Sequence, residues 1–500
     1  MDKKLAVILI FSLLFLSVLY AYPEDPSSEF TGKSGLKSAL NEFSKDEALK
    51  NTSWGFYAAD ARTGKIILDH NPDLALIPAS TQKVVTTLTA LSMLGSNYQF
   101  ETLLQYDGKI ENDILKGNLY IKGFGNPMLG AKMVDDSLAL DLVFAEWLKE
   151  IKATGIKTIE GNIIADGSWF DDHMIPSKWI WEDMGNYYGA GAHALTTHEN
   201  LYSVFFQPGS LEGAPATVVK TDPTVPGITF HNDVGTGPRG SGDNVYIYGS
   251  PYSNRRWLTG TVPLGENNFE VKGSLPDPGH FLAASWASFL QHNNIKVKES
   301  VYTHRDMPLS EYSDTRVIIS RHLSPYLEDI ASRTNFNSVN TYAENLIKTL
   351  GKEFKDEGSF SAGSDVIKAF WEEKGLDTRG LRILDGSGLS PYNNITVRQL
   401  TGMLLFAAQD EALYNSLLKG FPVAGESGSL AGMFRGTSSE GILRAKSGFL
   451  GNVRAYAGYT RARDGHLIAF TIIVNNYTGP PLEMRRKMEK VMDALTGMKL

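Results

Sequence analysis

Apolar positions recur with different periods along the chain, and the first part combines a helix, a hairpin and a second helix. A helix over about residues 35–49 is predicted by three apolar residues at helical spacing, Leu36, Leu40 and Phe43. Residues 54–68 place aromatic and β-branched runs on both sides of an Asp/Gly turn, which predicts a β-hairpin. A helical run over 84–91 follows directly.

The middle of the chain, residues 98–306, has mainly the pattern of short strands separated by turns. Helical spacing returns within it over about 137–153 and 279–293. Residues 158–166 predict a pair of strands joined by a turn. We interpret 98–306 as inserted material, organised as two nested small domains.

Beyond residue 307 the pattern is helical again and then becomes three strands, over 442–447, 453–460 and 467–474. The chain closes with a helix that has one apolar face, formed by Met484, Met488, Val491 and Leu495. Helices at both ends around an antiparallel sheet predict an α+β domain built from residues 30–97 and 307–500 and interrupted by the insertion.

Composition and the first residues limit the function classes. The net charge of −8 and the pI near 5.8 argue against a nucleic-acid partner. Residues 1–21 combine two lysines, an apolar run and a small final residue, which is typical of a cleaved secretory signal. An uncleaved anchor is the alternative, but a membrane span usually needs about 20 apolar residues. The chain has no cysteine, so we expect an exported, periplasmic or extracytoplasmic protein without disulfides.

The candidate chemistry starts with Ser80 and Lys83, at the beginning of the helical run. Residues three apart on a helix share a face, and a lysine with a lowered pKa can accept the proton of a serine hydroxyl. The spacing alone is weak, because Ser34 with Lys37 and Ser416 with Lys419 repeat it.

Two further motifs follow in order and raise the specificity of the pattern. Ser338-Val339-Asn340 begins a predicted helix, and Lys446-Ser447-Gly448 lies on a predicted strand. The order Ser-x-x-Lys, Ser-x-Asn and Lys-Ser-Gly resembles the three signatures of penicillin-binding proteins and serine β-lactamases.

Longer stretches narrow the resemblance to the D-alanyl-D-alanine carboxypeptidase/endopeptidase family of class C low-molecular-mass penicillin-binding proteins. The stretches that carry it are 117–123, 181–191, 385–390 and 422–425. The long gap between Lys83 and Ser338 is similar to the insertion of this family, which β-lactamases lack. The resemblance implies a penicillin-binding/serine β-lactamase-like α+β catalytic domain carrying a large, mostly β insertion.

The resemblance also implies a role for each motif residue. Ser80 becomes the acyl-enzyme on a D-Ala-D-X bond of a peptidoglycan peptide, Lys83 takes its proton, and Ser338 relays a proton to the leaving amine. The substrate-binding residues are Asn340, Lys446, Ser447, Gly448 and Phe449, with the backbone N–H groups of Ser80 and Phe449 forming an oxyanion hole. β-Lactams are expected as covalent inhibitors, and no cofactor or metal is expected. A second cation at Lys446 is expected to depress the pKa of Lys83.

Three positions depart from the family pattern. Ser447 stands where threonine is commoner, Val339 where asparagine is frequent, and Pro391 where an arginine is usual. The loss of that arginine leaves the substrate preference open. Asp183 and Tyr188 are expected at the edge of the pocket.

Other readings stay open at this level. His193 and His198 lack metal-ligand spacing on a helix. A β-lactamase or esterase on the same fold and a catalytically inert peptidoglycan-binding protein are the alternatives to the peptidase. The sequence does not separate carboxypeptidase from endopeptidase use, nor does it fix the oligomeric state.

Overall fold

The computed structural model describes residues 33–132, 136–298, 300–307, 312–313 and 315–500. The predicted signal peptide, residues 1–21, lies outside the described residues. Within the described part of the chain, no helix combines the length and apolar character needed to cross a bilayer.

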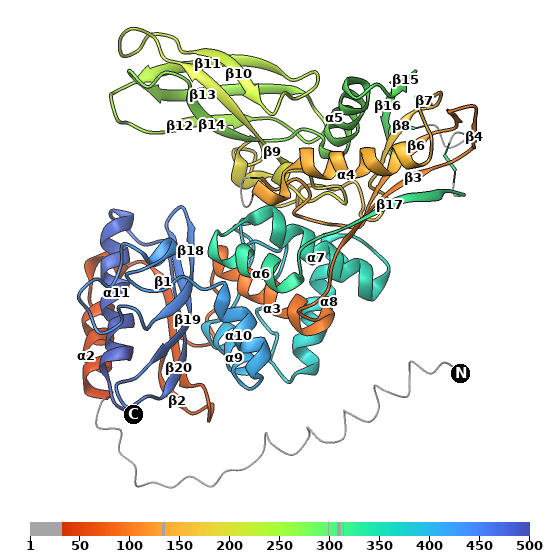
Figure 1. The fold of residues 1–500 in the computed structure, drawn as a ribbon. Helices are drawn as coiled ribbons and strands as arrows, with labels where there is room; N and C mark the ends of the chain where they lie inside the picture. The colour runs from red at the N-terminus through yellow and green to blue at the C-terminus, as the bar shows by residue number, and fades with distance from the viewer. Residues whose placement is uncertain (1–32, 133–135, 299, 308–311, 314) are drawn as a thin grey trace, which may run out of the picture.

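The two ends of the chain build one five-stranded antiparallel sheet in the order β18-β19-β20-β1-β2. Its strands are β1 (Ser53–Asp60), β2 (Ile66–His70), β18 (Arg444–Leu450), β19 (Val453–Arg461) and β20 (Leu467–Asn475). The terminal helices α2 (Lys33–Ser44) and α11 (Pro481–Gly497) pack together on one face, as Figure 1 shows. The predicted α+β fold with an antiparallel sheet between helices is confirmed.

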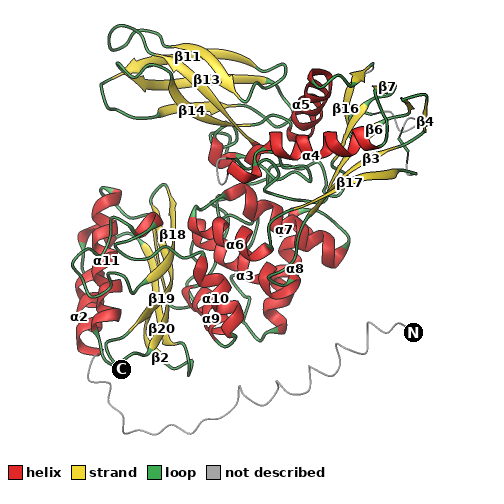
Figure 2. Ribbon diagram, viewed as in Figure 1, coloured by secondary structure: helices red, strands yellow, loops and turns green. Residues whose placement is uncertain are grey.

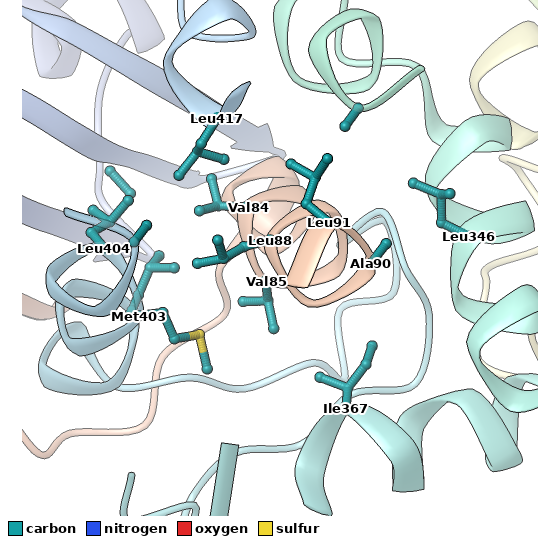
Figure 3. Close-up of a cluster of buried hydrophobic side chains, with 14 of the residues drawn as sticks. Val84, Val85, Leu88, Ala90, Leu91, Leu346, Ile367, Met403, Leu404 and Leu417 are labelled. Atoms are coloured by element: carbon teal, nitrogen blue, oxygen red, sulfur yellow. The ribbon is translucent and has the colours of Figure 1, made fainter. Parts of the chain in front are cut away.

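A group of helices covers the other face of this sheet (Figure 2). Its members are α3 (Gln82–Leu94), α6 (Leu327–Phe336), α7 (Asn340–Lys355), α8 (Phe360–Glu373), α9 (Val397–Ala408) and α10 (Glu411–Lys419). Helix α3 is buried on all sides over residues 82–91, as expected for a helix whose apolar residues are not confined to one stripe. In Figure 3, Val84, Leu88 and Leu91 of α3 pack among side chains of the surrounding helices.

The inserted region has two sheets beside helices α4 (Leu140–Ala153) and α5 (Pro278–His292). The first, in the order β16-β8-β6-β3-β17, contains β3 (Glu101–Tyr106), β6 (Leu119–Gly123), β8 (Ile163–Asp166), β16 (Val301–Thr303) and β17 (Val317–Leu323). The second, in the order β15-β7-β5-β4, contains β4 (Lys109–Glu111), β5 (Ile114–Lys116), β7 (Thr158–Ile159) and β15 (Lys296–Val297). Strand β17 pairs with β3, so the first sheet continues past residue 306.

The expected strand pair over residues 158–166 is wrong. Strands β7 and β8 do not pair with each other but enter different sheets, where they lie parallel to β5 and β6. Two strands that alternate apolar residues around a turn have the same local pattern whether they pair together or with other strands.

A smaller β unit is nested within the inserted region and lies at the top of Figure 1. One sheet has the order β10-β9-β14, with β9 (Leu201–Gln207), β10 (Thr217–Asp222) and β14 (Phe269–Ser274). The other has the order β11-β13-β12, with β11 (Thr229–Gly237), β12 (Asn244–Tyr248) and β13 (Arg255–Pro263). Their inner faces share one apolar core.

Candidate active site

Ser80 and Lys83 meet at the junction between a short 3-10 turn and helix α3. The turn covers Ala79–Thr81, so Ser80 precedes the first α-helical residue, Gln82. Ala79 has a φ of +46°, a left-handed conformation that is unusual for a residue with a Cβ. The Nζ atom of Lys83 lies 3.0 Å from Oγ of Ser80, within hydrogen-bonding distance.

The other contacts of Lys83 define which protonation state suits this geometry. Its Nζ lies 2.6 Å from Oδ1 of Asn340 and 2.9 Å from the carbonyl oxygen of Ser387, and both oxygens can only accept. A neutral amine has two N–H bonds and one lone pair. When the two N–H bonds point to these acceptors, the lone pair is left to accept the hydroxyl proton of Ser80.

Burial favours this neutral form. Lys83 is fully buried, and its burial lowers the pKa of the ammonium group to about 7, against the opposing effect of Glu344 and Asp385. Desolvation is the main cause of this shift, so Lys446 does not have the leading part in it that was expected. Burial first, and then the charge of Lys83, lowers the pKa of Lys446.

Asn340 joins the second motif to the first. Its Nδ2 donates to the backbone carbonyl of Tyr188 at 2.7 Å, which leaves Oδ1 to face Lys83. The predicted pocket residue Tyr188 therefore contacts Asn340 through its backbone. Asp183 is also largely buried, and burial, with a contribution from Glu182, raises the pKa of its carboxyl to about 6.

The third motif lies on β18 and faces the second. Nζ of Lys446 is 2.9 Å from Oγ of Ser338 and 2.8 Å from the carbonyl oxygen of Ser447. Ser338 has a φ of +59°, immediately before helix α7. The hydroxyl of Ser447 donates to Oγ of Ser429 at 2.7 Å, a neighbour that the sequence did not indicate.

Gly448 allows β18 to approach the nucleophile turn. A Cβ at this position would lie 2.8 Å from the carbonyl oxygen of Pro78 and 3.1 Å from the backbone nitrogen of Ser80. Only a residue without a side chain permits that distance without displacement. The next residue, Phe449, has an exposed side chain.

The loop over residues 385–390 supplies the parts of the site that sequence reasoning missed. Glu344 accepts hydrogen bonds from the backbone N–H groups of Gly386 and Ser387, at 2.8 and 2.9 Å, and this fixes the carbonyl that faces Lys83. Burial, followed by the nearby Asp385, raises the pKa of Glu344 to about 8. The Asp-Gly-Ser-Gly stretch was a signal for this loop, but its contact with Lys83 spans 304 positions in the sequence.

The two other Ser-x-x-Lys pairs lie in different surroundings. Ser34 and Lys37 are exposed on α2. Ser416 and Lys419 both contact Glu328, at 3.4 and 2.8 Å. Neither of these pairs has the buried amine that makes a lysine basic catalyst effective at neutral pH.

Taken together, the geometry suits acyl transfer by a serine nucleophile. A half-buried hydroxyl faces a buried amine with a pKa near 7, and a second buried amine faces a second hydroxyl. This arrangement provides a nucleophile, a base and a route for a proton to a leaving group.

Comparisons with known proteins agree with this chemistry. The profile of the D-Ala-D-Ala carboxypeptidase 3 (S13) family matches residues 36–497. The chain is 28% identical to a D-alanyl-D-alanine carboxypeptidase of Actinomadura sp. (strain R39), over 96% of this chain and 88% of that protein. It is 27% identical to D-alanyl-D-alanine carboxypeptidase DacB of Haemophilus influenzae, over 87% of each.

Solved structures show the same fold. The crystal structure of penicillin binding protein 4 (DacB) from H. influenzae aligns with a TM-score of 0.79 at 24% identity, covering 91% of this chain and 98% of that one. The structure of that protein complexed with a β-lactam aligns with a TM-score of 0.72 at 23% identity, covering 91% of this chain and 97% of that one.

Proposed function

The chain belongs to the D-Ala-D-Ala carboxypeptidase 3 (S13) family and is a serine carboxypeptidase, and from this premise we propose how its residues perform the reaction. The observation that carries the proposal is the buried amine of Lys83, held between the hydroxyl of Ser80 and two obligate acceptors.

In the acylation step, Oγ of Ser80 attacks the carbonyl carbon of the D-Ala-D-X peptide bond as Lys83 accepts the hydroxyl proton. The backbone N–H groups of Ser80 and Phe449 stabilise the oxyanion, a contribution that is often the largest in acyl transfer. The C–N bond then breaks, and Ser338, which is paired with Lys446, passes its proton to the departing amine. The proton that Lys83 took from Ser80 replaces it on Ser338, so that Lys83 is neutral again before deacylation.

In the deacylation step, a water molecule attacks the ester carbonyl and Lys83 accepts its proton. The bond to Oγ breaks, the proton returns to Ser80, and a new carboxylate is released.

Before acylation, Lys446 and Ser447 bind the terminal carboxylate of the substrate, and Gly448 allows strand β18 to lie close to the nucleophile turn. A β-lactam acylates Ser80 in the same way, but its leaving amine stays attached to the acyl group.

We assign the preference for the side chain of the peptide substrate to Asp183. Pro391 supplies no charge at the position where the family pattern has an arginine. A carboxylate in a partly desolvated pocket attracts an amine more strongly than it would in water. Peptides that keep a free side-chain amine on the diamino acid are therefore preferred. D-Ala-D-X bonds occur both at the terminal D-Ala residues of peptides and in D,D-cross-links. The proposed function therefore includes both carboxypeptidase and endopeptidase action.

Substrates of this kind belong to the cell wall, which is consistent with an extracytoplasmic enzyme. Export through the predicted signal in residues 1–21 is part of this proposal. We also propose that the mature chain divides into a catalytic unit and an inserted region. Strand β17, which pairs with β3, is assigned to the inserted region.

The test is mass spectrometry after exposure to penicillin and then to a cross-linked muropeptide. We expect one acyl adduct, on Ser80, that is absent from Ser80→Ala. Ser416→Ala is the matched control, since Ser416 also precedes a lysine by three positions, and it should keep the adduct. An adduct that persists in Ser80→Ala would reject the assignment, and rapid release of the opened β-lactam would favour the β-lactamase alternative.

A further inference from the structure

An exposed row of aromatic rings lies on the sheet β11-β13-β12, away from the catalytic residues. The outward positions of this sheet include Trp257 of β13 and Tyr248 of β12, with Trp181 from a neighbouring loop beside them. Trp181 and Trp257 are 53% and 47% exposed. A water-facing side of a sheet is usually polar, so large exposed rings that gather there mark a binding surface.

The rings form a continuous line across the strands. The centroid of His231 lies 6.4 Å from that of Trp257, Trp257 lies 5.7 Å from Tyr248, and Tyr248 lies 5.9 Å from Trp181, against which it stacks. Strand register explains the order, because Trp257 is opposite His231 on one side and opposite Tyr248 on the other. Together these four residues define what we call the aromatic row.

A cavity of about 430 Å³ lies along the aromatic row. This volume falls in the range of sites for small molecules or single units of a polymer. Polar side chains complete its lining: Thr229, Ser250 and Ser253 supply hydroxyl groups, and the exposed Arg255 and the buried Arg256 supply guanidinium groups. Hydroxyl and guanidinium groups at these positions can exchange hydrogen bonds with hydroxyl and acetamido groups of a ligand.

The row and its cavity are held in place before any ligand binds. Nε1 of Trp257 donates to Oδ2 of Asp233 at 2.7 Å, which fixes the orientation of the indole ring. The buried guanidinium of Arg256 donates to the carbonyl oxygens of Ser250 and Ser253, which fixes the loop beside the cavity. A site that is ordered in advance loses less entropy when it binds.

The aromatic row is connected to the active site by the short segment from Trp181 to Tyr188. These two residues are seven positions apart in the sequence, so their Cα atoms are at most about 25 Å apart. In between, Asn186 accepts from the backbone N–H of Ile247 in β12 at 3.1 Å, and the carbonyl of Tyr188 accepts from Asn340 at 2.7 Å. A polymer that lies on the row can therefore deliver an attached peptide to the catalytic residues.

We propose that the aromatic row binds the glycan strand of peptidoglycan, a β-1,4-linked chain of N-acetylated hexosamines. The C–H face of a pyranose ring is apolar and slightly positive, so it stacks on the negative face of an aromatic ring. The polar lining suits the hydroxyl and acetamido groups. This inference rests on the proposed function for its choice of polymer, and it assigns the glycan to a surface separate from the peptide site.

The test measures binding of a tetramer of β-1,4-linked N-acetylglucosamine by calorimetry, for the full chain and for Trp181→Leu and Trp257→Leu. Leucine keeps apolar bulk but removes the flat ring. We expect each substitution to weaken binding about tenfold, because one stacking face is lost. Phe354→Leu is the control, since Phe354 is a similarly exposed ring on α7, and it should bind the tetramer like the wild type.

A second measurement separates this inference from the peptidase assignment. Cleavage of a soluble stem pentapeptide ending in D-Ala-D-Ala should have the same kcat/KM in all four proteins, while intact peptidoglycan should show a higher KM in the two tryptophan variants. Failure of the wild type to bind the tetramer, or equal binding by the variants, would overturn the glycan site. Equal losses on pentapeptide and polymer would overturn it too. If the pentapeptide is not cleaved but tetramer binding changes as expected, only the peptidase assignment fails.

Discussion

Replacing Lys446 by methionine tests whether burial alone sets the basicity of Lys83. Methionine keeps most of the apolar volume of the lysine stem but has no charge, so the desolvation of Lys83 should persist. The fall of the Lys83 pKa from 10.5 to about 7 is attributed first to burial and corresponds to about 5 kcal/mol. Removal of a neighbouring positive charge would by itself raise this pKa.

The assay is the rate of acylation by a chromogenic β-lactam between pH 5 and 10. In the wild type the rate should rise with pH and reach half its maximum near pH 7, as Lys83 loses its proton. Lys446→Met should keep this midpoint, because the cause of the shift is unchanged. The maximal rate should fall about 10- to 100-fold, because the charge-assisted contact with Ser338, about 1.5–3 kcal/mol, is lost.

Lys446→Ala serves as the contrasting variant. It leaves space for water near Lys83, so its midpoint should move to higher pH while that of the methionine variant stays. A shift of one pH unit or more in Lys446→Met would show that the charge of Lys446 controls Lys83, and the burial argument would be refuted.

Three further predictions address other parts of the site and the core. Asp183→Asn should remove the preference, measured as kcat/KM, for peptides with a free side-chain amine over peptides with an acetylated one. In the wild type this preference should weaken as the pH falls below about 6, because the carboxyl of Asp183 becomes protonated. Gly448→Ala should slow acylation at least tenfold, because the added Cβ would lie 2.8 Å from the carbonyl of Pro78, while near-ultraviolet circular dichroism stays native. Leu88→Ala in the fully buried α3 should lower the free energy of unfolding by about 2–5 kcal/mol in a denaturant titration, with equal stability contradicting its place in the core.

Several features could be predicted from the sequence because they depend on local pattern. Period-3.6 and period-2 spacing predicted the hairpin of β1 and β2, the strands β18 to β20 and the final helix α11. The first helix was predicted over about 35–49, but α2 ends at Ser44 and Glu47–Leu49 form a separate 3-10 turn. The order of three short motifs, together with the long insertion, indicated the family, which the S13 profile confirms.

The tertiary structure decided the features that depend on contacts between distant residues. The carbonyl of Ser387 and the amide of Asn340 reach Lys83 across 304 and 257 positions, and no spacing rule indicates such a contact. For the same reason, the sequence did not predict that β7 and β8 pair with other strands and not with each other. The pKa of Lys83 depends on how completely the fold excludes water from its amine. The aromatic row forms because strand register aligns residues of β11, β13 and β12. Local sequence determines which elements form, whereas burial and register are properties of the assembled chain.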